Sequence, residues 1–218
     1  IDLDAAADHD SGEDQVDGFV TTWYDQSGEG NDAVQSVATS QPKIVHEGAL
    51  IADGLSFNGS TSGMDIDGLA LQSTEYYMTA VIDLQSTPSG TLKTIFDSTD
   101  ATNAGAALAY SNTNSQLTPF MFDGDDSTAN VFGGGADLTT NKTLVGAQFK
   151  SGASESYING GVNSTLANTW TSAGTNTFTK STIGYDQGTA GRIMDGRLAE
   201  LIIYNSDQSS NRTGIEGN

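Results

Sequence analysis

Hydrophobic and polar residues alternate along several short stretches of this chain, a period of two that predicts β-strands. The clearest stretch is Tyr76–Leu84, in which every second residue from Tyr76 is apolar while the positions between are mixed. Because side chains of a strand point alternately to its two faces, one face of this segment should be buried. Further strands are predicted at residues 19–24, 92–97, 106–110, 117–122, 143–150, 154–159, 181–186 and 197–204.

The segments between these stretches carry turn residues, chiefly Gly, Ser, Thr, Asn and Asp. Asn159-Gly160-Gly161 predicts a tight hairpin, because Asn and Gly adopt positive φ at low steric cost. The final stretch, 197–204, is largely apolar on both faces, which is typical of a central strand. One short helix is expected to start near Asp207, whose side chain can cap it. Many short strands joined by turns predict an all-β antiparallel sandwich or barrel.

The charge balance indicates what the chain does not bind. It has 8 Lys and Arg against 28 Asp and Glu, a net charge of −20. Nucleic acids and anionic membranes attract basic proteins, so neither is an expected partner. The absence of cysteine excludes disulfides, thiolate metal sites and a cysteine nucleophile. No apolar run reaches the ~18 residues of a membrane span, so no membrane insertion is expected.

The length of 218 residues fits a single domain. Residues 1–18 are mostly acidic or small and are predicted to form an irregular N-terminal segment, followed by a β-sandwich domain over residues 19–218. The chain starts with Ile1 and shows no signal peptide, which we interpret as an excised piece of a longer protein.

The chain carries several short motifs in a characteristic order. Residues 19–33 read Phe-Val-Thr-Thr-Trp-Tyr-Asp-Gln-Ser-Gly-Glu-Gly-Asn-Asp-Ala, and residues 54–59 read Gly-Leu-Ser-Phe-Asn-Gly. Later come Tyr-Ile-Asn-Gly at 157–160 and Gly-Arg-Leu-Ala-Glu-Leu-Ile-Ile-Tyr-Asn at 196–205. This order resembles laminin G-like modules of the concanavalin A-like lectin and glucanase superfamily, especially those of phage virion and marine bacterial surface proteins. The resemblance implies an antiparallel two-sheet jelly-roll sandwich.

The superfamily includes lectins, hydrolases, lyases and attachment modules, so the fold leaves the function open. The leading hypothesis is a non-catalytic recognition or attachment module that binds a glycan or another cell-surface ligand. Such a module would be extracellular, within a phage virion or bacterial surface protein. One alternative is a structural decoration or spacer domain that contacts other virion or adhesin subunits. The other is a glycoside hydrolase or polysaccharide lyase.

The hydrolase alternative requires two carboxyl groups flanking the scissile bond. Fungal α-L-arabinofuranosidases, which share the Tyr-Asp-Gln-Ser-Gly motif, carry a nucleophilic glutamate in a cysteine-flanked segment. The corresponding residues 95–103 contain neither, so that activity does not transfer. Glu200 interrupts an apolar strand face and is either a general acid or a partner of Arg197 or of a main-chain amide at the sheet surface. Other candidates are Glu75, Glu155, Asp83, Asp97 and Asp186, but no paired-carboxylate motif supports catalysis, and no catalytic residue is assigned.

Calcium is the predicted cofactor, because it prefers several oxygen ligands and because laminin G-like modules often hold it at the sandwich rim. Two groups of closely spaced aspartates are the candidate ligands, although neither completes an EF-hand loop. They are Asp8, Asp10 and Asp14 near the start, and Asp123, Asp125 and Asp126 after a predicted strand.

Sugar binding requires exposed aromatic faces and polar groups that pair with hydroxyls. Trp170 and Tyr110 are the candidate platforms, with Asn112 and Asn114 as neighbouring polar partners. Either ring can instead be a core aromatic. In the first motif, Asp25 and Asn31 either bond to nearby main-chain amides or hold a ligand.

Overall fold

The computed structural model describes residues 2–4, 16–69, 71, 75–85, 92–99, 105–111, 116–122, 129–131, 133–134, 138, 141–167 and 180–217. Within these residues the chain forms 18 strands, one 3₁₀ turn at Ala38–Ser40 and one five-residue helix, α1, at Arg212–Glu216. The strands are β1 (Asp2–Asp4), β2 (Gly18–Trp23), β3 (Ala33–Val34), β4 (Lys43–His46), β5 (Ala49–Leu50), β6 (Leu55–Asn58), β7 (Met64–Asp67), β8 (Tyr76–Leu84), β9 (Lys93–Asp97), β10 (Gly105–Ser111), β11 (Gln116–Leu117), β12 (Phe120–Phe122), β13 (Ala129–Val131), β14 (Thr143–Phe149), β15 (Ser154–Ile158), β16 (Gly161–Leu166), β17 (Lys180–Ile183) and β18 (Asp195–Tyr204).

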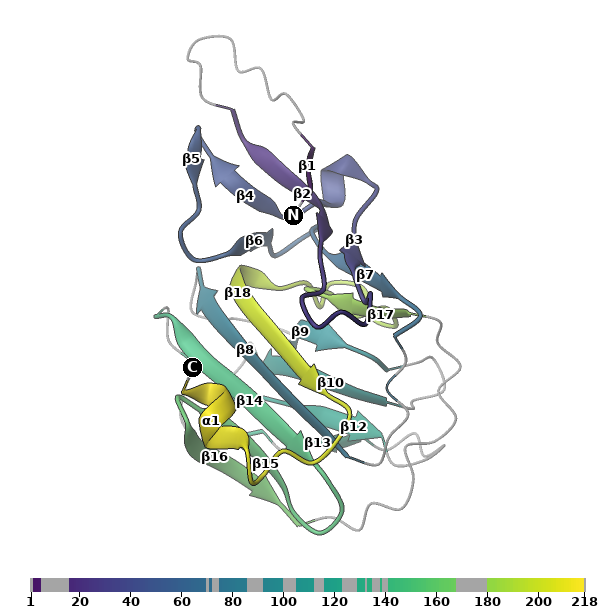
Figure 1. Ribbon diagram of the computed structural model, residues 1–218, viewed down its shortest axis with the longest axis vertical. Helices are drawn as coiled ribbons and strands as arrows, with labels where there is room; N and C mark the ends of the chain where they lie inside the picture. Colours follow the sequence, from purple (N-terminus) through teal and green to yellow (C-terminus); the bar gives the residue numbers. More distant parts are fainter. Residues whose placement is uncertain are drawn as a thin grey trace.

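The strands form two layers. The front sheet runs β6-β18-β8-β14-β15-β16, and the back sheet runs β3-β7-β17-β9-β10-β12-β13. Figure 1 shows β8, β14 and β18 in front of β9, β10 and β12. Strand β2 pairs with both β3 and β4 and so links the layers. All of these pairings are antiparallel, which confirms the predicted all-β jelly-roll sandwich.

The core lies between the two sheets, and β8 supplies its centre. The alternate residues of β8 predicted to be apolar are buried, and they pack with buried residues of the back sheet such as Phe96, Leu108 and Ile183. Burying side chains of this size contributes about 1.5–3 kcal/mol each, which explains how a domain without disulfides holds together. The inward residues of β8 are Tyr76, Met78, Ala80, Ile82 and Leu84.

Strand β18 differs from its prediction as a uniformly central strand. It pairs with β8 along most of its length but with β6 only from Asp195 to Leu198. Its register against β8 shifts between Leu198 and Glu200, so Ala199 is an extra residue, a β-bulge. After the bulge, Leu201 and Ile203 contact the core while Glu200 and the alternate residues beyond it face outward.

Gly54 explains why the chain can pack so closely at this bulge. Its φ is +99°, and a Cβ there would lie 2.2 Å from the carbonyl oxygen of Leu198 and 2.5 Å from Cα of Ala199. Both neighbours are main chain and cannot move aside cheaply. Glycine is therefore required at this position both by conformation and by space.

The chain ends show two further differences from expectation. Of the predicted irregular segment 1–18, Asp2–Asp4 form β1 and pair with β2, whose first residue is Gly18. The helix expected near Asp207 begins at Arg212 instead, and the Asp207 carboxylate accepts a hydrogen bond from the main chain of Ser209. The Asn159-Gly160 hairpin is confirmed, with φ of +49° and +79°. No helix among the described residues has the length and apolar character to cross a membrane.

Candidate functional site

A groove of about 840 Å³ lies on the outer face of the front sheet, between β18 and the chain that follows it. This volume is within the ~300–1,000 Å³ typical of small-ligand sites. One side is formed by outward-facing residues of β18, and the other by the turn before α1 and by α1 itself. The lining residues are Glu200, Ile202, Tyr204, Ser210, Asn211, Thr213, Gly214 and Ile215.

Tyr204 gives the groove an aromatic surface. Its side chain is 38% exposed, and its ring lies 6.5 Å from the ring of Tyr77 at an interplanar angle of 37°. Tyr77 is buried and lies beside Tyr204 on the same face of the sheet, since the two residues are paired across β8 and β18. An exposed ring fixed in this way can pack against the C–H face of a sugar.

Polar groups flank the aromatic surface. Glu200 is exposed and makes no hydrogen bond or ion pair with any described residue. Asn211 contributes an amide, although its Nδ2 already donates to Gln208 Oε1 at 3.0 Å. Ser210 and Thr213 contribute hydroxyls. An aromatic face beside carboxylate, amide and hydroxyl groups matches the chemistry of a polyhydroxylated ligand.

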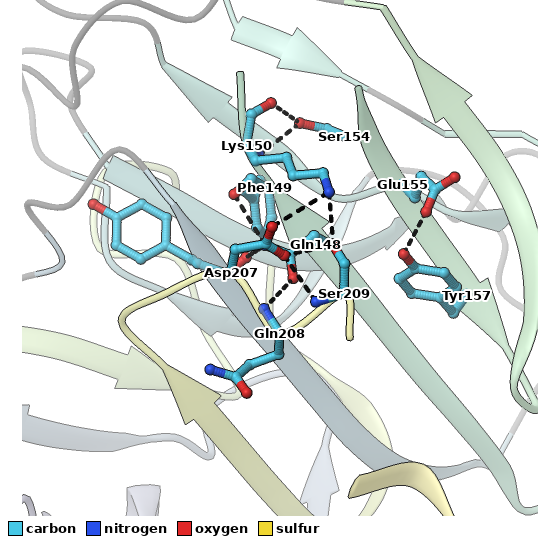
Figure 2. Close-up of polar contacts among 10 residues, drawn as sticks. Gln148, Phe149, Lys150, Ser154, Glu155, Tyr157, Asp207, Gln208 and Ser209 are labelled. Atoms are coloured by element: carbon cyan, nitrogen blue, oxygen red, sulfur yellow. Dashed lines mark hydrogen bonds and ion pairs between the residues drawn. The ribbon is translucent and has the colours of Figure 1, made fainter. Parts of the chain in front are cut away.

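The wall opposite β18 is held in place by buried and charged contacts with β14. Gln148 is fully buried, and its Oε1 accepts a hydrogen bond of 2.9 Å from the main-chain N–H of Gln208. Lys150 Nζ donates to Ser209 Oγ at 2.7 Å and pairs with Asp207 at 3.4 Å (Figure 2). The turn at 207–209 therefore has a fixed position over the sheet.

Helix α1 is tied to the same face by a second set of contacts. The Arg212 guanidinium lies 4.1 Å from the ring centroid of Tyr157, pairs with Glu216 and donates to the Gly160 carbonyl at 2.9 Å. The hydroxyl of Tyr77 donates to Glu216 Oε1 at 2.7 Å. Burial, together with Glu216, raises the pKa of Tyr77 well above its usual value, so this hydroxyl stays protonated and remains a donor. Both walls of the groove are thus fixed to one rigid sheet.

The structure places one predicted sugar-binding residue in the core. Tyr110 is 1% exposed, and its hydroxyl accepts a hydrogen bond of 3.1 Å from the main-chain N–H of Asp195. It offers no ring face to solvent, because residue 110 points inward between the sheets, the alternative that the sequence left open. Trp170, Asn112 and Asn114 lie outside the described residues.

The calcium prediction is not tested by the structure, because all six candidate aspartates fall outside the described residues: Asp8, Asp10, Asp14, Asp123, Asp125 and Asp126. Within the described part of the chain, no group of three or more acidic or histidine side chains is placed to hold a metal ion.

Sequence reasoning found one of the groove residues, Glu200, but for a different role. Glu200 is exposed rather than enclosed in an apolar face, and Arg197 pairs with Asp53 and Asp83 instead. Tyr204 and Asn211 were missed as site residues. The available signal was the aromatic at the end of the last strand, followed by a polar segment.

The motif at residues 19–33, which contains Asp25 and Asn31, has a structural role. The Asp25 carboxylate accepts hydrogen bonds from Ser27 N and Oγ at 2.8 and 2.7 Å, and from Asn31 N at 3.1 Å. These bonds, the main-chain Ser27 bond first, hold the pKa of Asp25 below its usual value. The Asp25 carboxylate therefore closes its own turn, as the main-chain alternative predicted for Asp25, while the side chain of Asn31 donates to the Asp25 carboxylate at 3.5 Å.

Two carboxyl groups lie close together in the back layer: Asp97 at the end of β9, and Asp186 in the loop that follows β17. Asp97 is 0% exposed, and its Oδ1 accepts hydrogen bonds of 2.8 and 2.7 Å from Thr99, while its Oδ2 has no hydrogen-bond partner. Burial, with Asp186 nearby, raises the pKa of Asp97 to about 7. Asp186 pairs with Arg192 at 2.7 Å. Both carboxyl groups are buried, so they do not form an open site for acid–base chemistry.

No protein family and no curated protein matches the sequence. Solved structures share its fold at low identity. Domain 4 of AbnA, a GH43 extracellular arabinanase from Geobacillus stearothermophilus, in complex with arabinotriose, is 20% identical, with a TM-score of 0.59 over 80% of this chain and 84% of that one.

Two further structures are similar to a comparable degree. The CBM40 of a Ruminococcus gnavus IT-sialidase bound to α2,6 sialyllactose is 13% identical, with a TM-score of 0.54 over 68% of this chain and 85% of that one. The heptameric SAP-like pentraxin from Limulus polyphemus is 12% identical, with a TM-score of 0.55 over 72% and 77%. Identities this low show a common jelly-roll sandwich fold and nothing further.

Proposed function

We propose that this domain is a non-catalytic glycan-binding module and that the groove beside β18 is its binding site. The observation that carries the proposal is the exposed Tyr204 ring, which lies beside Tyr77 and is flanked by the carboxylate of Glu200. Similar folds in solved structures bind arabinotriose and sialyllactose, which supports a sugar as the ligand class. The laminin G-like motifs favour a setting in a phage virion or bacterial surface protein, and hence outside the cell.

Replacing Tyr204 by alanine is expected to weaken glycan binding at least about tenfold, because the stacking surface is lost. Phenylalanine at the same position keeps the ring and should retain most of the binding. Binding is measured by probing a glycan array with the fluorescently labelled domain, in the presence and absence of calcium, and by titration calorimetry with each glycan that binds.

Tyr24 provides a matched control, since its side chain is 40% exposed and it lies outside the groove. Substituting Tyr24 by alanine should leave the array pattern unchanged. A blank array for the unmodified domain contradicts the glycan-binding function and leaves a structural spacer as the better function. Equal binding by Tyr204→Ala contradicts the assignment of the binding site to the groove.

Calcium binding remains a proposal of its own, supported by the spacing of the two aspartate groups and by the laminin G-like resemblance. Calcium added to protein stripped with EDTA and then freed of EDTA should raise the unfolding temperature, as mass action requires of a ligand that binds the folded state. Substituting Asp123, Asp125 and Asp126 together by asparagine separates that group from the N-terminal one.

A further inference from the structure

We infer that the groove selects neutral glycans and rejects acidic ones, an inference that rests on the proposed glycan-binding function. It follows from where the few basic side chains of the chain are placed. Acidic sugars are normally held by arginine or lysine, whose charges pair with the carboxylate or sulfate. The selectivity of the site therefore depends on whether a cation faces the groove.

All eight Lys and Arg lie within the described residues, so the remainder of the chain can supply none. Seven of them form an ion pair with a carboxylate: Lys43, Lys142, Lys150, Lys180, Arg192, Arg197 and Arg212. The eighth, Lys93, donates to the main-chain carbonyls of Gly59 and Gly191 at 3.2 and 3.4 Å. Each basic side chain already has an acceptor.

Of the cations near the groove, Arg197 on β18 pairs with Asp53 and Asp83 and does not line the groove. Two others, Lys150 and Arg212, are used to build the groove wall. Lys150 holds Asp207 and Ser209, and Arg212 lies over Tyr157 while pairing with Glu216. Neither lines the groove. To recruit either one, a ligand would have to break contacts that position the wall itself.

Glu200 is the charged residue that lines the groove, and it is negative. A carboxylate brought within a few ångströms of it meets like-charge repulsion at short range, where salt screens little. The overall charge of −20 adds a weaker repulsion at longer range, which salt does screen. Sugar hydroxyls, in contrast, can donate to the Glu200 carboxylate, so the same residue favours neutral ligands.

The test compares pairs of glycans that differ only by an acidic group, beginning with sialyllactose against its neutral carboxamide and extending to sulfated or uronic glycans and their neutral counterparts on the array. EDTA is present so that calcium cannot bridge two carboxylates. We expect the neutral member of each bound pair to bind at least about tenfold more tightly than the acidic member. Glu200→Gln should lower this ratio several-fold, because it removes the charge and keeps the shape.

Glu29→Gln is the matched control, since it removes one carboxylate charge from an exposed turn outside the groove. It should leave the ratio unchanged. Acidic glycans that bind as tightly as their neutral partners overturn the inference but leave the glycan-binding function standing. A ratio lowered equally by both variants also overturns it, because net charge would then be responsible. If neither kind of glycan binds, either in EDTA or with calcium added back, the proposed function itself fails.

Discussion

Replacing Gly54 by alanine is expected to destabilise the protein by about 3 kcal/mol or more, the largest effect we expect from adding a single methyl group. The new Cβ would lie 2.2 Å from the Leu198 carbonyl oxygen and 2.5 Å from Ala199 Cα, at a φ of +99° that side chains rarely adopt. Strained backbone and main-chain overlap are both among the mechanisms that give large losses. Urea unfolding followed by tryptophan fluorescence measures the change in free energy.

Gly48 is a suitable control because it shares the positive φ without the close approach. Its φ is +75°, and nothing lies within 4 Å of the position that an alanine methyl group would take. Alanine at Gly48 should cost only about 1 kcal/mol, the conformational part alone. Equal losses at the two glycines would show that space beside β18 is not the constraint. The substitution at Gly54 should also weaken glycan binding in the folded fraction, since the bulge it supports turns Glu200 outward.

Asparagine in place of Asp97 is expected to remove most of the pH dependence of stability between pH 4 and pH 8. Burial raises the pKa of Asp97 from 3.8 to about 7 in the folded chain. From about pH 4 to pH 7 the folded state keeps this proton while the unfolded state has lost it, so stability falls as the pH rises and then levels off. A shift of this size corresponds to roughly 4 kcal/mol.

The quantity to measure is the free energy of unfolding of the variant minus that of the unmodified protein, at several pH values. This difference should rise by up to roughly 4 kcal/mol from pH 4 to pH 8, whatever constant cost the amide itself brings. Asp25→Asn is the control, because the pKa of Asp25 is lowered and its stabilisation is lost only as the pH falls below the usual aspartate range. The difference in free energy of unfolding between Asp25→Asn and the unmodified protein should stay constant from pH 5 to pH 8. A constant difference for Asp97→Asn as well would show that Asp97 is ionised throughout.

The sequence was sufficient to predict the sandwich because its strands bury one face each. Strand β8 begins and ends where the alternation of Tyr76–Leu84 does, and the Asn159-Gly160 turn joins β15 to β16 as expected. Such signals are local: each depends on neighbouring residues and on the fixed period of a strand.

The groove could not be predicted in this way, because it depends on two features that lack a local pattern. The bulge at Ala199 places Leu198 and Leu201 on the same face, which a strict alternation assigns to opposite faces. The wall depends on long-range contacts such as that between Gln148 and Gln208, which are 60 residues apart. The burial of Tyr110 also could not be predicted. A tyrosine at the end of a strand has the same local sequence context whether it is exposed or buried.

The residues that line the groove all come from one short segment of the chain. All eight lining residues fall between Glu200 and Ile215, while residues that anchor the groove wall lie elsewhere in the chain, on β14 (Gln148), just after it (Lys150) and on β15 (Tyr157). The segment that lines the groove is therefore distinct from the strands that hold it in place. We therefore expect substitutions at Ser210, Asn211, Thr213 and Gly214 to change what the proposed site binds without disturbing the core.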